Sequence, residues 1–94
     1  MAVEFQASKT RENLMRAFAG ESQARNRYTF AADAAKKQGL YSIQQVFLFT
    51  ADQERAHAER YYDLLKNLSG TTIEISGGYP VDHFDDVVKL LKKA

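Results

Sequence analysis

Three residues able to bind a metal ion stand at suggestive spacing in this sequence: Glu21, Glu54 and His57. Glu54 and His57 are three positions apart, so in a helix both side chains lie on one face and can reach the same ion. Glu21 belongs to another segment, and it adds a third ligand only if the fold brings the two segments together. Carboxylate oxygens with one imidazole suit iron or manganese better than copper, so the chemistry indicated is metal binding.

Two long helices are predicted to position these ligands. Apolar and small residues recur at spacings of three and four over about 10–37 and again over about 41–68, which is typical of bundle helices. Ser8 or Thr10 is the expected N-cap of the first helix. Gly39 suits its end because glycine enters the left-handed region without a steric clash. So short a connection makes the two helices antiparallel neighbours.

The distance from the turn places the three ligands at one level of this hairpin. Glu21 lies eighteen positions before Gly39, Glu54 lies fifteen after it, and His57 lies eighteen after it. At about 1.5 Å of rise per residue, all three are roughly 23–27 Å from the turn. Each helix is expected to bury its apolar face against the other helix, and burying a carboxylate there without a partner is costly. Polar residues at one depth on both of these faces therefore favour a metal ion that they share.

The rest of the chain is predicted to be a crossover followed by a short helix. Residues 70–81 contain one strand-like stretch without a partner strand, so we expect an extended connection along the bundle surface. Asp82 is expected to cap a short helix over residues 82–93. Residues 1–94 are therefore predicted to form one all-α domain.

The chain holds half of the ligand set of a di-iron bundle. Such bundles take one Glu from each of two helices and a Glu-x-x-His pair from each of the other two. Two copies related by a twofold axis would supply the full set. We therefore expect a homodimer around a shared site, with exchange of the crossover and terminal helix as one way to form it.

Simpler interpretations exist for each of these residues. A helical Glu is usually solvated, a Glu-x-x-His string often occurs by chance, and His57 alone could be a core histidine bonded to a carboxylate. Metal binding is favoured because polar residues on the facing sides of both helices fall at one level of the hairpin. Tyr28 lies two turns after Glu21, and its spacing fits either a hydroxyl that reaches a metal ligand or an ordinary buried tyrosine.

Composition excludes several other classes of function. A formal net charge of +1 gives no electrostatic case for binding nucleic acid or a membrane surface. The absence of cysteine excludes a disulfide framework, a zinc ribbon, an iron–sulfur cluster and a thiol nucleophile. No apolar run is long enough to span a bilayer, and the N-terminus lacks the pattern of a signal peptide, so a cytoplasmic protein is expected.

Two motifs resemble a known family. Residues 17–28 (AFAGESQARNRY) and 50–58 (TADQERAHA) look like the first two bundle helices of rubrerythrins. These are ferritin-like di-iron proteins that reduce hydrogen peroxide to water. The resemblance runs from about Thr10 to the end of the chain. It implies a ferritin-like helical hairpin, which is half of a four-helix bundle and is completed by dimerisation.

The resemblance also implies a role for each site residue. Glu21 would be a terminal carboxylate ligand, Glu54 a carboxylate that bridges both irons, and His57 an imidazole ligand. Tyr28 would be catalytic, through a hydrogen bond near the iron-bound carboxylates. Iron is then the expected metal, and manganese or zinc could also occupy the site.

The sequence also departs from the family pattern. Family members continue into a second helix pair and commonly a rubredoxin-like domain with four cysteines, and this sequence contains neither. The expected function is therefore that of a peroxidase, an oxidoreductase with a rubredoxin-type external electron donor. Two alternatives are a ferritin-like ferroxidase and a non-catalytic fragment or assembly module that dimerises through its apolar seams.

Overall fold

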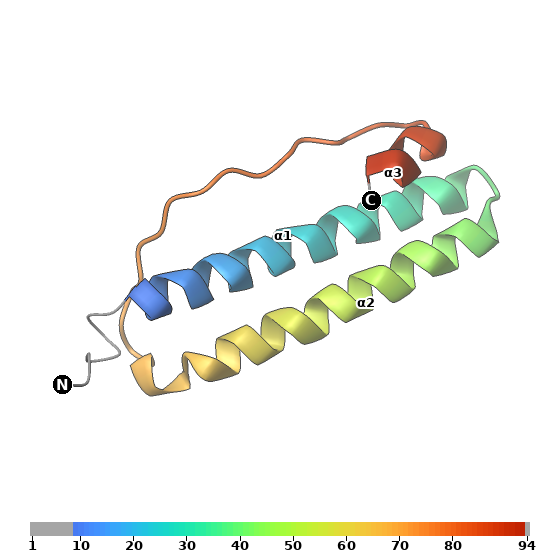
Figure 1. The fold of residues 1–94 in the computed structure, drawn as a ribbon. Coiled ribbons are helices and arrows are strands. Elements are labelled where there is room, and N and C mark those ends of the chain that lie inside the picture. Colours follow the sequence, from blue (N-terminus) through green and yellow to red (C-terminus); the bar gives the residue numbers. More distant parts are fainter. Residues whose placement is uncertain (1–8, 94) are drawn as a thin grey trace.

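The fold is an antiparallel pair of long helices with a short third helix beside their turn (Figure 1). The structure is a computed structural model and describes residues 9–93. Helix α1 is Lys9–Lys37, α2 is Tyr41–Leu64 and α3 is Val87–Lys93. Residues 9–93 contain no strand. The predicted all-α helical hairpin is confirmed.

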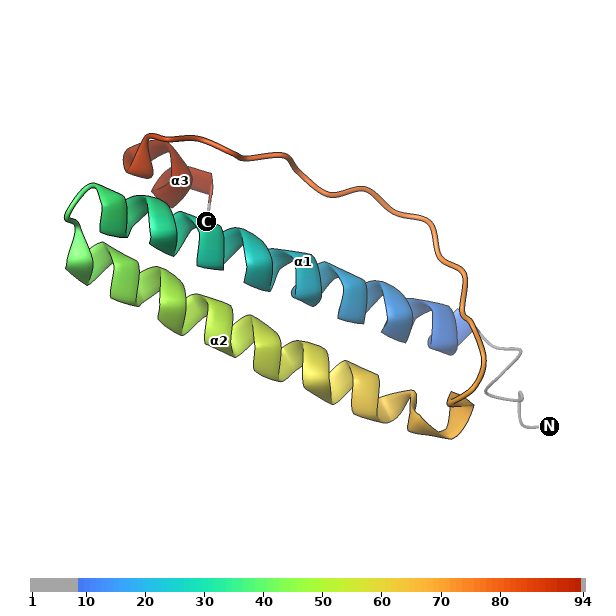
Figure 2. The same ribbon diagram turned by 180° about the vertical axis from the view of Figure 1, so that it is seen from behind.

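The turn between α1 and α2 is made at Gly39, as predicted. Gly39 has a φ of 73°, in the left-handed region that favours glycine. The Leu40 N–H donates to the Ala35 carbonyl at 2.9 Å, and the Gly39 N–H donates to the Lys36 carbonyl at 3.0 Å. This Schellman motif satisfies carbonyl groups that the helix end leaves free. The chain therefore reverses within a few residues, and α1 and α2 lie side by side (Figure 2).

Small side chains line the contact between the two long helices. Phe47 is the large side chain buried among them, with 2% of its surface exposed. Small residues let two helix axes approach closely, because the distance between packed helices depends on the side chains at the contact. The buried alanines are Ala24, Ala31, Ala32 and Ala35 on α1 and Ala51 and Ala58 on α2.

Among residues 9–93, no helix combines the length and apolarity that crossing a membrane requires.

The helix ends differ in detail from the prediction. Of the two expected N-caps, Ser8 lies outside the described residues, and Thr10 lies within α1 instead of preceding it. Helix α2 ends at Leu64, and a 3₁₀ turn over Lys66–Leu68 takes the place of its expected last turn. Such tightening is common where a helix ends.

The prediction that Asp82 caps the short helix is wrong. Helix α3 begins at Val87, and it is the Oδ1 atom of Asp86 that accepts a hydrogen bond from the Val88 N–H, at 2.9 Å. Asp82 instead lies 4.0 Å from the Arg27 guanidinium on α1, as an ion pair. The crossover is therefore longer than expected and continues past residue 81 to Asp86.

The crossover runs along α1 from the far end of the hairpin back to the turn (Figures 1 and 2). The Arg16 Nε donates to the Ser76 carbonyl at 3.2 Å, and the Gln38 side chain donates to the Asp85 carbonyl. At its end, Val87 of α3 is buried in a cluster with Phe47 and three alanines of α1. Helix α3 therefore covers the turn end of the hairpin.

Candidate metal centre

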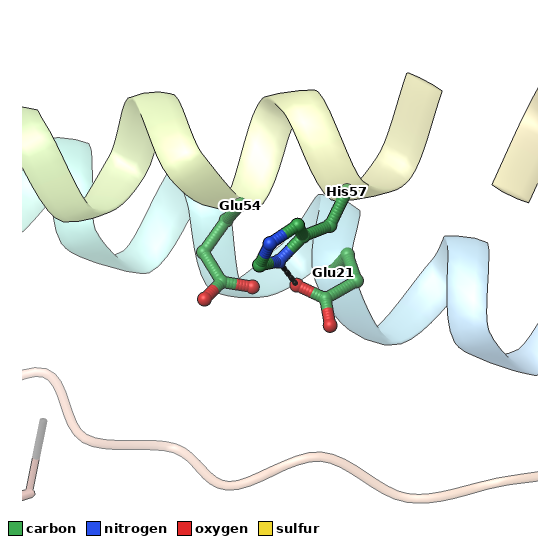
Figure 3. A group of neighbouring side chains, drawn as sticks. All are labelled: Glu21, Glu54 and His57. Carbon is green, nitrogen blue, oxygen red and sulfur yellow. Dashed lines mark ion pairs between the residues drawn. The ribbon is translucent and has the colours of Figure 1, made fainter. Parts of the chain in front are cut away.

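Glu21, Glu54 and His57 come together between the two long helices (Figure 3). One ligand atom from each residue lies within 4.8 Å of the other two. Helix α1 presents Glu21, and α2 presents the other two, one helical turn apart. The side chains of Glu54 and His57 extend from α2 toward Glu21 on α1 (Figure 3). The structure thus brings together the three residues singled out in the sequence, and their role as metal ligands stays a prediction.

Rigid elements hold these three side chains in place. Each residue lies well inside a long helix, where its backbone is fixed by hydrogen bonds on both sides. Buried alanines lie one turn away on both helices, Ala24 beside Glu21 and Ala51 beside Glu54. Close packing at these alanines fixes the distance between α1 and α2 at the level of the ligands. The site is therefore organised by helix packing and does not depend on a loop.

One carboxylate oxygen of Glu21, the Oε2 atom, is buried but has no hydrogen-bond partner among the described residues. The Nδ1 atom of His57 lies 3.5 Å away, which is an ion-pair distance but is too long for a good hydrogen bond. A desolvated carboxylate without a partner is costly, and a cation bound among the three groups would remove this cost. The residues present therefore fit a metal ion.

The site is open on one side. The side chain of His57 is 59% exposed, whereas that of Glu21 is 26% exposed. His57 is therefore not part of the core of the hairpin itself. Three ligand groups also do not fill the six positions of the octahedral coordination common for metals with oxygen ligands. Further ligands would have to approach from the open side.

Tyr28 lies two turns along α1 from Glu21, where its ring packs against α2. The rings of Tyr28 and Phe47 are stacked, with centroids 6.3 Å apart and an interplanar angle of 20°. Tyr28 is partly buried at the edge of the core cluster. The structure therefore gives the ring a packing role, and the proposed role of its hydroxyl stays a prediction.

A second polar network on α1 was not foreseen from the sequence. The Gln23 Nε2 donates to the Gly20 carbonyl at 2.7 Å, and the Arg27 Nε donates to the Gln23 Oε1 at 2.7 Å. Arg27 also pairs with Asp82 of the crossover. The spacing of four between Gln23 and Arg27 could have indicated the first contact, but no local signal points to Asp82. The network ties the part of α1 between Glu21 and Tyr28 to the crossover.

Comparison with known proteins decides the family. The rubrerythrin family model matches residues 12–92, which is most of the chain. The chain belongs to the rubrerythrin family. The resemblance inferred from the two helical motifs is thereby confirmed.

Individual rubrerythrins agree with this assignment. The rubrerythrin of Clostridium perfringens is 48% identical over 88 residues, covering 93% of this chain and 45% of the relative. Rubrerythrin-1 of Clostridium acetobutylicum is 49% identical over 89 residues, covering 93% of this chain and 46% of the relative. The rubrerythrin of Porphyromonas gingivalis is 43% identical over 94 residues, covering 100% of this chain and 46% of the relative. The chain thus spans a little under half the length of these rubrerythrins.

Proposed function

We propose that this chain supplies half of a di-iron centre that reduces hydrogen peroxide to water, with Glu21, Glu54 and His57 as metal ligands. The observation that carries this proposal is the convergence of the three groups, with ligand atoms within 4.8 Å and one buried carboxylate oxygen left without a hydrogen bond. Family membership supports iron as the metal. A second copy of the chain would supply the other half of the ligand set.

Each residue of the chain has a distinct part in this proposal. The carboxylates of Glu21 and Glu54 bind iron and neutralise its positive charge, and His57 adds a nitrogen ligand. Tyr28 donates a hydrogen bond to a ligand carboxylate and holds it in position, as partners of metal ligands commonly do. When bound, a pair of ferrous ions supplies the two electrons that convert hydrogen peroxide and two protons into two water molecules.

An external electron donor completes the proposed cycle. The 94 residues contain no cysteine with which to hold an iron–sulfur group, so these residues offer no electron-donating centre of their own. We propose a rubredoxin-type carrier as the partner that returns the two electrons. Its contact with this chain is proposed to be transient, as in other weak electron-transfer complexes.

The proposed activity is tested by reacting the ferrous protein with peroxide. Protein loaded with ferrous iron in the absence of oxygen is expected to consume hydrogen peroxide roughly 100-fold faster than free ferrous ion, because fixed positioning lowers the barrier. The measurement is peroxide loss by stopped flow in matched buffers. A rate equal to that of free ferrous ion would contradict the proposal. A faster reaction with dioxygen, with release of ferric product, would instead support a ferroxidase.

Replacing Tyr28 by phenylalanine tests the role of its hydroxyl. A hydrogen bond to a charged group contributes about 1.5–3 kcal/mol, so Tyr28→Phe is expected to slow peroxide consumption about tenfold or more. Iron content per chain should stay unchanged, because Tyr28 is not proposed as a ligand. Tyr41→Phe, at an exposed tyrosine that begins α2, is the matched control. Equal rates for the two variants would show that Tyr28 is a packing residue only.

A further inference from the structure

A cavity of about 670 Å³ lies between α1 and the end of the crossover, where the crossover reaches α3 (Figure 1). Phe30, which lines it, lies nine positions after Glu21. Nine residues are about two and a half helical turns, so Phe30 is on the opposite side of α1 from Glu21. Small-molecule sites have volumes of about 300–1,000 Å³. The cavity is therefore separate from the proposed metal site and large enough for a small organic ligand.

Apolar side chains from three segments line this cavity. They are Phe30 of α1, Val81 and Phe84 of the crossover and Leu90 of α3. Phe30 is 58% exposed and Val81 is 88% exposed. Both side chains thus offer apolar surface that the described part of the chain leaves uncovered. Burying such surface against the apolar body of a ligand is favourable.

The charged groups around the cavity favour a cation as the polar part of that ligand. Two positively charged side chains, Arg27 and Lys37, line the cavity. Three carboxylates also line it: Asp33, Asp82 and Asp85. The ring of Phe84 already holds one ammonium group, because the Nζ atom of Lys89 lies 5.6 Å from its centroid. Cations are attracted to aromatic faces, and the exposed ring of Phe30 can bind a second ammonium group in the same way.

Asp82 is the carboxylate that calls for a hydrogen-bond donor. Its side chain is 14% exposed, so water reaches it poorly. The Arg27 guanidinium lies 4.0 Å away, which is beyond hydrogen-bond distance, and its Nε atom donates to Gln23 at 2.7 Å. A shielded carboxylate is stabilised by charged donors, and an ammonium group offers three N–H bonds. A ligand amine would therefore satisfy a group that the chain pairs at long range.

We propose that this cavity binds a small primary amine with an aromatic or aliphatic body. The ammonium group donates to the Asp82 carboxylate, and the body packs against Phe30 and Val81. Such a ligand contacts α1 and the crossover at the same time, so its binding holds the crossover on α1. The proposed site involves no metal ligand, and it goes beyond the proposed peroxidase function.

Titration of 2-phenylethylamine into the metal-free chain, with a chelator present, tests this site by amide NMR. Saturable shifts are expected at the residues of α1, the crossover and α3 that line the cavity, with a Kd on the order of 1 mM. The neutral analogue 2-phenylethanol has nearly the same shape and should bind about tenfold more weakly, because it lacks the charge that pairs with Asp82. The anion phenylacetate should bind more weakly than either.

Two variants locate the ligand. Asp82→Asn removes the charged acceptor and Phe30→Ala removes the aromatic face, and each should weaken amine binding about tenfold. Asp52→Asn is the matched control for the first, because Asp52 also pairs with an arginine, Arg55 of α2, and lies outside the cavity. Phe49→Ala, at a phenylalanine of α2 that is 65% exposed, is the control for the second. Neither control should change the Kd.

Several results would overturn the proposal. Equal affinities for the amine and the alcohol, or tighter binding of phenylacetate, would show that the cavity does not select a cation. Shifts that map to other residues, or no saturable shift up to about ten times the expected Kd, would show that the site is not here. An unchanged Kd in Phe30→Ala has the same meaning. This variant decides the matter even if Asp82→Asn releases the crossover, because Phe30 is exposed and its truncation should leave the circular dichroism spectrum unchanged.

Discussion

Glu21→Gln is expected to stabilise the metal-free protein and to remove most of its stabilisation by metal. The substitution keeps the shape of the side chain but removes a charge whose Oε2 atom is shielded and without a hydrogen bond. Removing a charge whose oxygen atom is shielded from water without a hydrogen bond is expected to stabilise the metal-free protein by about 1 kcal/mol. With metal present, the same change removes a proposed ligand. Glu21→Gln is then expected to be less stable than the native protein.

Urea denaturation with and without ferrous iron, under anaerobic conditions, measures both effects. Iron at 100 times its dissociation constant should raise the free energy of unfolding of the native protein by about 2.7 kcal/mol. Glu21→Gln should lose most of this increment. Glu59→Gln, at an exposed carboxylate of α2 that pairs with Arg55, is the control and should behave like the native protein. If iron raises the free energy of unfolding of Glu21→Gln as much as that of the native protein, Glu21 is not a ligand.

The largest expected loss of stability comes from Phe47→Ala. Phe47 is 2% exposed and packs with Val87 and the alanines of α1, whereas Phe49, two positions on, is 65% exposed. Truncating a buried phenylalanine costs about 3–5 kcal/mol, through lost apolar burial and the cavity left behind. Small domains have only about 5–15 kcal/mol of stability in total, so the variant should be close to unfolding at room temperature.

Circular dichroism during urea denaturation of the metal-free protein measures this loss. Phe49→Ala is the control, and its free energy of unfolding should change by no more than about 0.5 kcal/mol. The two variants remove the same side chain from the same helix, so helix propensity and composition are matched. Similar losses for both would mean that the packing of α2 on α1 is not as the structure has it.

The hairpin and the convergence of the three ligands could be predicted because both depend on local rules. Helical periodicity and one glycine define two antiparallel helices, and the constant rise of a helix then fixes which residues share a level. Glu21 and Glu54 lie at one level of the hairpin for this reason. The depth of each residue needs no knowledge of side-chain packing, and the packing at the small residues of the seam only adjusts the distance between the helices.

The start of α3 could not be predicted because a distant contact decides it. Asp82 and Asp86 are equally good caps by residue type. Asp82 pairs with Arg27 across more than fifty residues of sequence, and this contact favours a position of Asp82 in the crossover. The exposure of His57 likewise depends on what covers the open side, which the spacing of residues in one chain does not show. Local patterns carry no information on either point.

The long crossover also has a consequence for the order of folding. The three ligand residues lie on helices joined at Gly39, so their meeting requires only a short loop to close, and such local contacts form early. Helix α3 meets Ala31 and Ala35 only after the crossover has been laid along α1, which closes a much longer loop at a greater entropic cost. A nascent chain can therefore bring Glu21, Glu54 and His57 of the proposed metal site together before α3 has packed on α1.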